Sequence, residues 1–285
     1  MLSLLERQIA AIEHRLVLLA PPDSHIPSYF GNVTSDETQH RRLVTDMQRL
    51  RGSVYLQDGA VTRHDLSSDG LHETPEDARS WHLLMRDEDG GLSACIWYLE
   101  HNTLPAFQQL RAQNCPLSRS YEWHDHVRRA VAAEVALARL ERVRYSEVGG
   151  WAVSEAARCT TEGLMMILAT FSLSRALGGA LGLATATVRH SSASMLQRLG
   201  LSKLEDIPSY YDPEYDCEME LLRFDTRRSS PKYHDAIEML KSRLSAVSVI
   251  VPEEAPVMAG AGARMPGMAI SLARECLTLP SASAA

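Results

Sequence analysis

The residues from Arg158 to Gly163 have the types and spacing of a site for an anionic group. They read Arg-Cys-Thr-Thr-Glu-Gly and stand between a β-type segment and an apolar helical segment. The first N–H groups of a helix lack partners within the helix, and the helix dipole favours negative charge there. Small residues let a phosphate approach these N–H groups, and Arg158 can add a charge-assisted hydrogen bond. The alternative is an ordinary helix start that Thr160 or Thr161 caps.

Four elements around this turn predict an α/β unit. Residues 145–153 form a strand that leads into the turn, and residues 164–180 form an apolar helix that stops at two glycines. Residues 181–188 are short, continuous and apolar, as buried strands are, and residues 191–201 form a short helix. This order indicates that a sheet positions the turn.

The rest of the chain supplies further helices and strands. We expect helices over 2–19, 36–50, 119–144 and 231–248, a hairpin over 81–100 with its turn at Asp87–Gly91, and a strand over 216–224. The pattern predicts three parts. These are an N-terminal helix and linker (1–30), the main domain (31–250) and a low-complexity, flexible tail (251–285).

Composition excludes several classes of function. Lys plus Arg number 29 and Asp plus Glu 36, so the net charge of −7 argues against general nucleic-acid binding. Five scattered cysteines without a Cys-x-x-Cys pair predict a reducing compartment. No membrane span or secretory signal is expected, so we predict a cytoplasmic protein. His124 and His126 cannot share a helix face, so no metal site is expected.

Residues 146–201 resemble the core of the GNAT acyltransferases, which has an Arg/Gln-x-x-Gly-x-Gly/Ala loop between strand and helix. Here the loop is Arg-x-x-Thr-x-Gly at 158–163, and the short helix ends in Leu-Gly-Leu at 199–201. The resemblance implies an α/β fold with a mostly antiparallel, V-split central sheet flanked by helices, here with an N-terminal helical extension. It implies an acyl-phosphopantetheine donor and no tightly bound cofactor. The residues it assigns to the donor are Trp151, Ala152, Val153, Arg158, Cys159, Thr160, Thr161 and Gly163.

Residues 36–225 also resemble a narrower branch, the acyl-homoserine-lactone synthases and long-chain N-acyl amino acid synthases. Residues 50–55 (Leu-Arg-Gly-Ser-Val-Tyr) match the Arg-x-x-Val-Phe of the branch, and a loop with Asp65 matches its aspartate-bearing loop. Arg-Asp-Glu-Asp-Gly at 86–90 matches its Arg-Asp-x-Asp-Gly. Residues 147–151 (Glu-Val-Gly-Gly-Trp) keep the acid and the aromatic of its Glu-x-Ser-Arg-Phe. The loss of Ser and Arg favours a different acceptor amine.

The reaction that the resemblance implies needs a proton acceptor and a polarised thioester carbonyl. Glu147 is the candidate catalytic residue, which takes the proton of the amine directly or through water; a salt bridge to a structural arginine is the alternative. An N–H near Gly149 and Gly150 is the candidate oxyanion donor, with a non-catalytic bulge as the alternative. Arg51 and Asp65 are candidates for the carboxyl and amino ends of the acceptor.

Apolar residues offer candidates for the acyl chain. Tyr55, Trp97 and Tyr98 complete the expected substrate-binding set. Trp97, Tyr98 and the methionines Met165 and Met166 line an acyl tunnel or pack in the core. Arginines within 119–144 either bind an acidic acyl-carrier protein or form a solvated helix face.

We therefore expect an N-acyltransferase that moves a medium- or long-chain acyl group from acyl-carrier protein or acyl-CoA to an amino acid or related small amine. Two alternatives stay open. One is an acyl-homoserine-lactone (autoinducer) synthase. The other is a GNAT-like module that binds an acyl thioester without turnover.

Overall fold

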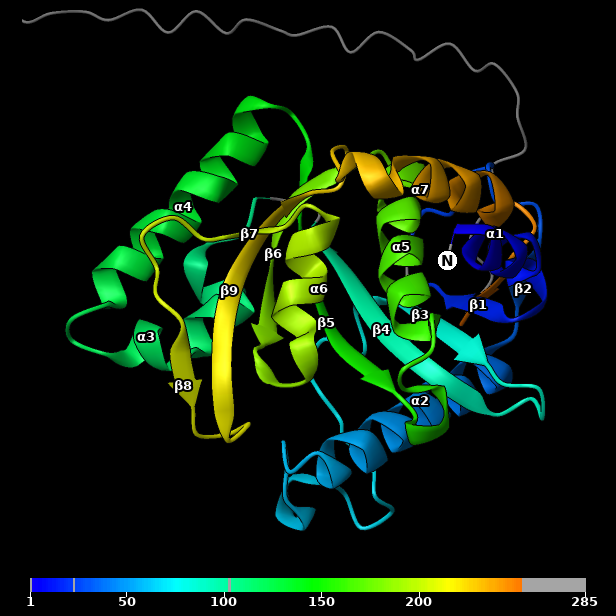
Figure 1. Cartoon of the computed structure of the whole chain (residues 1–285), viewed down its shortest axis with the longest axis horizontal. Helices are drawn as coiled ribbons and strands as arrows, with labels where there is room; N and C mark the ends of the chain where they lie inside the picture. Colours follow the sequence, from blue (N-terminus) through cyan, green and yellow to red (C-terminus); the bar gives the residue numbers. More distant parts are fainter. Residues whose placement is uncertain (1, 23, 102–103, 253–285) are drawn as a thin grey trace, which may run out of the picture. The chain divides into compact units, whose positions relative to one another are not determined.

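The computed structural model describes residues 2–22, 24–101 and 104–252, which form a sheet with helices on both faces (Figure 1). The helices are α1 (Leu2–Ala10), α2 (Glu37–Gln57), α3 (Pro116–Arg119), α4 (His124–Leu140), α5 (Glu162–Ala176), α6 (Ser192–Leu199) and α7 (Pro231–Leu244). The strands are β1 (Leu16–Leu19), β2 (Val33–Ser35), β3 (Trp81–Arg86), β4 (Leu92–His101), β5 (Arg144–Val153), β6 (Ala180–Thr187), β7 (Ser202–Lys203), β8 (Tyr210–Asp212), β9 (Cys217–Asp225) and β10 (Ser248–Val251).

The sheet is mixed and mostly antiparallel. Its strand order is β2-β10-β1-β3-β4-β5-β6-β9-β7, and β8 pairs with β9. The pairs β1–β10, β10–β2 and β5–β6 are parallel, whereas the remaining neighbours run antiparallel. Pairing of β5 with β6 ends at Val148 and Ala184, and beyond that point the two strands diverge (Figure 1). The expected V-split sheet flanked by helices is confirmed.

Alternation along the strands divides the core between the two faces. Leu18 of β1 packs in the cluster that contains residues of α1, α5 and α7, while Val17 and Leu19 pack in the cluster of α2. The helix α4 forms a third cluster with β5, β6 and β9. This arrangement follows from the period of two in a strand, which sends successive side chains to opposite faces.

Local side-chain chemistry fixes several element boundaries. Asp36 Oδ1 accepts the N–H of Gln39 at 2.8 Å and caps α2. Pro231 opens α7, where its missing N–H leaves no partner unsatisfied. In the predicted hairpin turn, Asp87 Oδ1 accepts the N–H of Gly91 at 2.7 Å, which stabilises the connection from β3 to β4.

Four expected helices differ from the structure, and the first of them, predicted over 36–50, extends to Gln57 as α2. The helix predicted over 2–19 ends at Ala10, and residues 16–19 form β1 instead. This strand lies between β10 and β3 and is buried on both faces, so its continuous apolar run fits a strand as well as a helix. The helix predicted over 231–248 ends at Leu244, and β10 follows it. The helix predicted over 119–144 is shorter, because α4 begins at His124 and ends at Leu140, and β5 begins at Arg144.

Other expectations concern membranes, metals and the tail. In the described part of the chain, no helix is long and apolar enough to cross a membrane. Among the same residues, no three or more His, Cys, Asp or Glu side chains gather where they could hold a metal ion. The tail that we expect to be flexible lies outside the described residues from position 253 onward.

Candidate active site

A cleft of about 560 Å³ opens where β5 and β6 diverge. The residues from Gly149 to Val153 of β5 line it, and they lie beyond the last pair between β5 and β6. Thr185, Ala186 and Thr187 of β6 line the opposite side. The edge of β5 in the cleft is therefore not paired with β6, and its main-chain groups can bind an extended ligand as a further strand would.

Trp97 of β4 lies at the irregularity that shapes the cleft. Pairing of β4 with β5 slips between Cys95 and Trp97, so two residues of β5, Gly150 and Trp151, face a single residue of β4. A Cβ on Gly149 or Gly150 would overlap the Trp97 indole, and Gly150 has φ +61°, where a side chain is strained. The glycines thus let the indole lie against β5. The oxyanion role of their N–H groups stays a prediction.

The predicted anion-binding turn does connect β5 to α5. Arg158, Cys159, Thr160 and Gly163 line the cleft. The Thr160 hydroxyl accepts the N–H of Glu162 at 3.1 Å, whereas Thr161, the N-cap residue of α5, makes no side-chain cap hydrogen bond. A Cβ on Gly163 would lie 3.2 Å from Trp151, so glycine lets the helix start close to β5. The turn thus places the start of α5 beside the cleft, without a side-chain cap from its N-cap residue.

Two arginines and one aspartate meet at this end of the cleft. The guanidinium of Arg158 donates to Asp58 just after α2, with N–O distances of 2.8 and 2.9 Å. Arg189 Nη1 donates to the main-chain carbonyl of Asp58 at 2.6 Å, and Nη2 donates to the carbonyl of Asp216. The side chains of Arg158 and Asp58 are 30% and 17% exposed. A phosphate entering here would compete with a carboxylate for Arg158.

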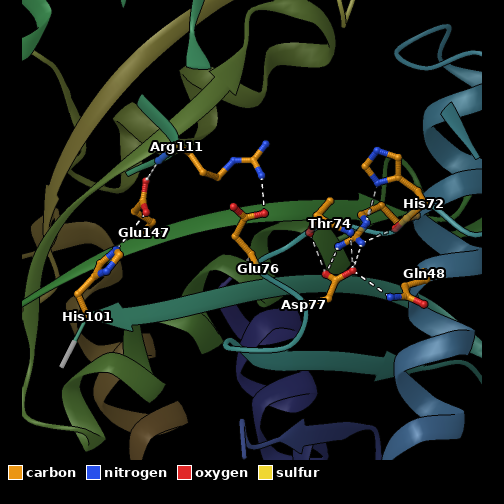
Figure 2. Close-up of polar contacts among 9 residues, drawn as sticks. Gln48, His72, Thr74, Glu76, Asp77, His101, Arg111 and Glu147 are labelled. Atoms are coloured by element: carbon orange, nitrogen blue, oxygen red, sulfur yellow. Dashed lines mark hydrogen bonds and ion pairs between the residues drawn. The ribbon is translucent and has the colours of Figure 1, made fainter. Parts of the chain in front are cut away.

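Arg51 lies at the other end of the cleft and is fully buried. Its Nη1 and Nη2 donate to the two oxygens of Asp77 at 2.9 and 2.6 Å. Its Nε donates to His72 Nδ1 at 3.1 Å, and Nη2 also donates to the His72 carbonyl. Asp77 in turn accepts from Gln48 and Thr74, as Figure 2 shows. Arg51 is thus the centre of a satisfied buried ion pair.

Arg111, the first residue of the 3₁₀ helix Arg111–Asn114, also lines this end of the cleft. Its guanidinium carbon lies 5.7 Å from the ring centre of Trp97, a cation–π distance. Its Nη1 donates to Glu76 at 2.7 Å (Figure 2). Its main-chain N–H donates to Glu147 Oε1 at 2.8 Å.

Glu147 is buried, and both carboxylate oxygens are engaged. Oε1 accepts the main-chain N–H of Arg111, and Oε2 lies 3.1 Å from His101 Nε2. The carboxylate is not among the described groups that line the main cleft. It lines a void of about 10 Å³ that also touches Arg111 and Thr185, two residues of the cleft. Its catalytic role stays a prediction.

Burial sets the protonation of the groups around Arg51. It lowers the pKa of His72 to about 4, and the positive charge of Arg51 adds to this shift. Burial also raises the pKa of Tyr55 and of Tyr215, whose rings lie 6.4 Å apart. All three side chains are therefore uncharged near neutral pH.

The cleft brings together most of the predicted site residues and leaves out a few. Arg51, Tyr55 and Trp97 line it, together with the β5 residues and most of the turn. The described lining does not include Thr161, Asp65, Tyr98 or Glu147. Asp65 Oδ2 accepts from the N–H and the hydroxyl of Thr62, both at 2.7 Å, and so caps an exposed turn. These hydrogen bonds lower its pKa.

The apolar residues considered for an acyl tunnel pack in the core. Met165 and Met166 are buried there with Tyr98, whose hydroxyl donates to Glu100 at 2.9 Å. The core alternative is therefore confirmed for the two methionines. Apolar lining of the cleft comes instead from α6 and β9, through Met195, Leu196 and Met219.

Five functional candidates were missed by sequence reasoning: Asp58, His72, Arg111, Arg189 and Tyr215. Each lies in a loop or at an element end, where no hydrophobic period or motif marks it. A usable signal exists only for Asp58, which directly follows α2, and for Arg189, which lies two residues beyond the end of β6. Charged residues at such positions often reach the ligand edge of a sheet.

Comparison with known proteins gives a result only at the level of structure. No protein family and no curated protein matches the sequence. The structure of the CoA-dependent acyl-homoserine lactone synthase BjaI with SAM and isopentyl-CoA is 11% identical, covers 86% of this chain and 95% of its own, and has a TM-score of 0.52. The same protein with MTA gives 12% identity, the same coverage and a TM-score of 0.51.

A further match is FeeM, an N-acyl amino acid synthase from uncultured soil microbes. It is 13% identical and covers 64% of this chain and 90% of its own, with a TM-score of 0.42. The likeness to BjaI is one of fold, a mixed α/β structure with a central sheet flanked by helices. This chain has the GNAT-like fold of the acyl-homoserine-lactone synthases.

Proposed function

We propose that the chain is an N-acyltransferase that joins the acyl group of an acyl-phosphopantetheine thioester to the amine of an amino acid or a related small molecule. The observation that carries the proposal is the edge of β5 that β6 leaves unpaired in the cleft, where the Tyr55 hydroxyl donates to the Trp151 carbonyl at 3.4 Å. An extended pantetheine arm can pair with this edge. Its phosphates would then meet the start of α5 and Arg158.

The length of the β5 edge in the cleft suits an extended ligand. The four residue steps from Gly149 to Val153 correspond to about 13 Å of strand along which the pantetheine arm could pair. The acyl group would leave the bulge toward the apolar lining of Met195 and Met219. The fold of BjaI, a CoA-dependent enzyme, makes acyl-CoA the first donor to test. Acyl-carrier protein is the second candidate.

In the proposed reaction, the amine nitrogen attacks the thioester carbonyl, the C–N bond forms, and the C–S bond breaks. The free thiol leaves with a proton, and the amine loses one. An N–H at Gly149 or Gly150 would stabilise the oxyanion. Glu147 would accept the proton through a water in the small void that it shares with Arg111, because that void has about the size of one water molecule.

The test is release of free thiol from decanoyl-CoA in the presence of a mixture of amino acids. The wild-type chain should release thiol and form N-decanoyl amino acids that mass spectrometry detects. Glu147→Gln should lower the rate by about 10²- to 10⁴-fold, the range for loss of a general base. An unchanged rate in this variant would remove Glu147 from the mechanism.

The fold of BjaI also keeps a lactone synthase as the second candidate. Such an enzyme would consume S-adenosylmethionine, whereas an amino acid synthase would ignore it. A chain that binds decanoyl-CoA, measured by thermal stabilisation, but releases no thiol with any amine would contradict both enzymes. It would instead support a module that binds acyl thioesters without turnover.

A further inference from the structure

The arginine expected to bind the acceptor is not available to it. Four hydrogen bonds from Arg51 go to Asp77 and His72, and the residue is 0% exposed. Opening the pair with Asp77 would leave a buried carboxylate without its counter-ion, which is costly. An acceptor carboxylate must therefore find its cation elsewhere in the cleft.

Arg111 has the free capacity that Arg51 lacks. Its Nη1 is bound to Glu76, whereas its Nε and Nη2 have no hydrogen-bond partner within the described ranges. Its side chain is 30% exposed, so these N–H groups are accessible. Trp97 supports the flat face of the guanidinium, and the carboxylate of Glu147 holds its main chain. The cation is therefore positioned at the cleft by contacts that a ligand need not break.

His72 adds a second donor. The Nε of Arg51 can only donate, so His72 Nδ1 must accept, and the proton of the neutral ring lies on Nε2. His72 lines the cleft, and its low pKa keeps the ring neutral at pH 7. The pair of Arg51 and Asp77 thus orients an uncharged N–H donor.

The two donors belong to the same corner. Figure 2 shows the Arg111 side chain extending from Glu147 toward the side of the site that holds His72. Tyr55 and Tyr215, whose hydroxyls stay protonated, line the same region. This corner is separated from the turn at Arg158 by the length of the β5 edge. A ligand group bound here would be distinct from the donor phosphates.

We propose that Arg111 and His72 bind the carboxylate of the acceptor, so that the acceptor is an α-amino acid or another amine with a carboxylate near its nitrogen. A guanidinium edge and a neutral N–H match the two oxygens of a carboxylate. The inference rests on the proposed function and extends it to a substrate class. Glu147 then has a positioning function for Arg111 in addition to any part in proton transfer.

Binding of product analogues tests the proposal without turnover. The probes are N-decanoyl derivatives of glycine, leucine and tyrosine, each as the free acid and as the carboxamide, titrated into the full chain by calorimetry. The wild-type chain should bind at least one acid about 30- to 100-fold more tightly than its amide, the range for a charge-assisted hydrogen bond at a partly buried site. Equal binding of every acid and its amide would overturn the proposal.

Variants then assign the preference to residues. Arg111→Gln should reduce binding of the acid to the level of the amide and leave the amide within about 3-fold, because only the carboxylate contact is lost. Arg111→Lys should retain part of the preference, since it keeps the charge but not the fork. His72→Asn keeps an acceptor for Arg51 and should cost the acid about 10-fold. Equal losses for acid and amide in Arg111→Gln would contradict the assignment.

Arg49→Gln is the matched control. Arg49 lies on α2 near Arg51, is 54% exposed and pairs with Asp46, so its loss should leave both affinities unchanged. Thiol release from decanoyl-CoA is measured in parallel. Acid preference without thiol release would support the carboxylate site and refute the acyltransferase, whereas thiol release without acid preference would do the reverse.

Discussion

The two ends of the cleft hold arginine–aspartate pairs of opposite character. At the end near α5, Arg158 and Asp58 are partly exposed, and Arg158 makes few other contacts. At the end near the Trp97 bulge, Arg51 is 0% exposed and its partner Asp77 is also buried. Both pairs join two oxygens to one guanidinium, so pairing alone does not distinguish them. Their solvent access does.

Solvent access decides which pair can exchange its partner for a ligand. When an exposed ion pair breaks, water hydrates both charged groups again, so such a pair contributes about 0–1 kcal/mol to stability. The charged groups of a buried pair are not rehydrated, and removal of one partner costs about 3–5 kcal/mol. We therefore regard the Arg51–Asp77 pair as part of the scaffold. Arg158 and Arg111 are partly exposed, so ligands can reach them.

Arg51→Met should give the largest effect. It leaves Asp77 buried without a counter-ion, so the free energy of unfolding should fall by about 3–5 kcal/mol. Urea unfolding followed by circular dichroism measures the change. Arg49→Met, on the exposed part of the same helix, should cost less than about 0.5 kcal/mol. A loss below about 1 kcal/mol in Arg51→Met would show that the buried pair is not structural.

Gly150→Ala should give an intermediate effect at the bulge that separates the two ends. The substitution adds a Cβ that overlaps the Trp97 indole and meets Arg51 Nη1 at 3.0 Å, at a residue with φ +61°. We expect a loss of about 2–4 kcal/mol, from the left-handed backbone and from overpacking together.

Gly90→Ala is the matched control for the backbone part of that effect. Gly90 has φ +84°, and a Cβ there has no neighbour within 4 Å. Its substitution should therefore cost only about 1–2 kcal/mol. Equal losses for the two variants in urea unfolding would mean that the contact with Trp97 does not constrain Gly150.

The central part of the fold could be predicted from the sequence because its signals are local. The apolar helix after Gly163, the strand before Arg158 and the hairpin turn at Asp87 each follow from patterns within a few residues. β1 could not be predicted in this way. Residues 16–19 continue the apolar period of the preceding helix, and only pairing with the distant β3 and β10 makes them a strand.

The candidate site likewise has one part that the sequence predicts and one part that it does not. The turn and the β5 edge are contiguous in sequence, and the structure brings both to one cleft. The corner of the cleft near Arg51 joins His72, Arg111 and Tyr215 from three segments far apart in the chain, so no spacing reveals it. Asp65 was assigned to the amino end of the acceptor by the resemblance of its loop, yet it caps an exposed turn at Thr62. Asp77, which no motif marks, is the aspartate that pairs with Arg51.

Asp58→Asn should give the smallest effect and the clearest contrast with Arg51. It removes the carboxylate that competes with phosphate for Arg158, so affinity for decanoyl-CoA should rise by about 2- to 5-fold, as expected for an exposed pair. Calorimetric titration measures the gain, which should shrink at high salt because exposed charges are screened. Arg158→Gln, the opposite change, should weaken the same binding by about 5- to 10-fold. If Asp58→Asn instead weakened binding, Asp58 would position Arg158 for the phosphates rather than compete with them, and the exposed pair would resemble the buried one in function.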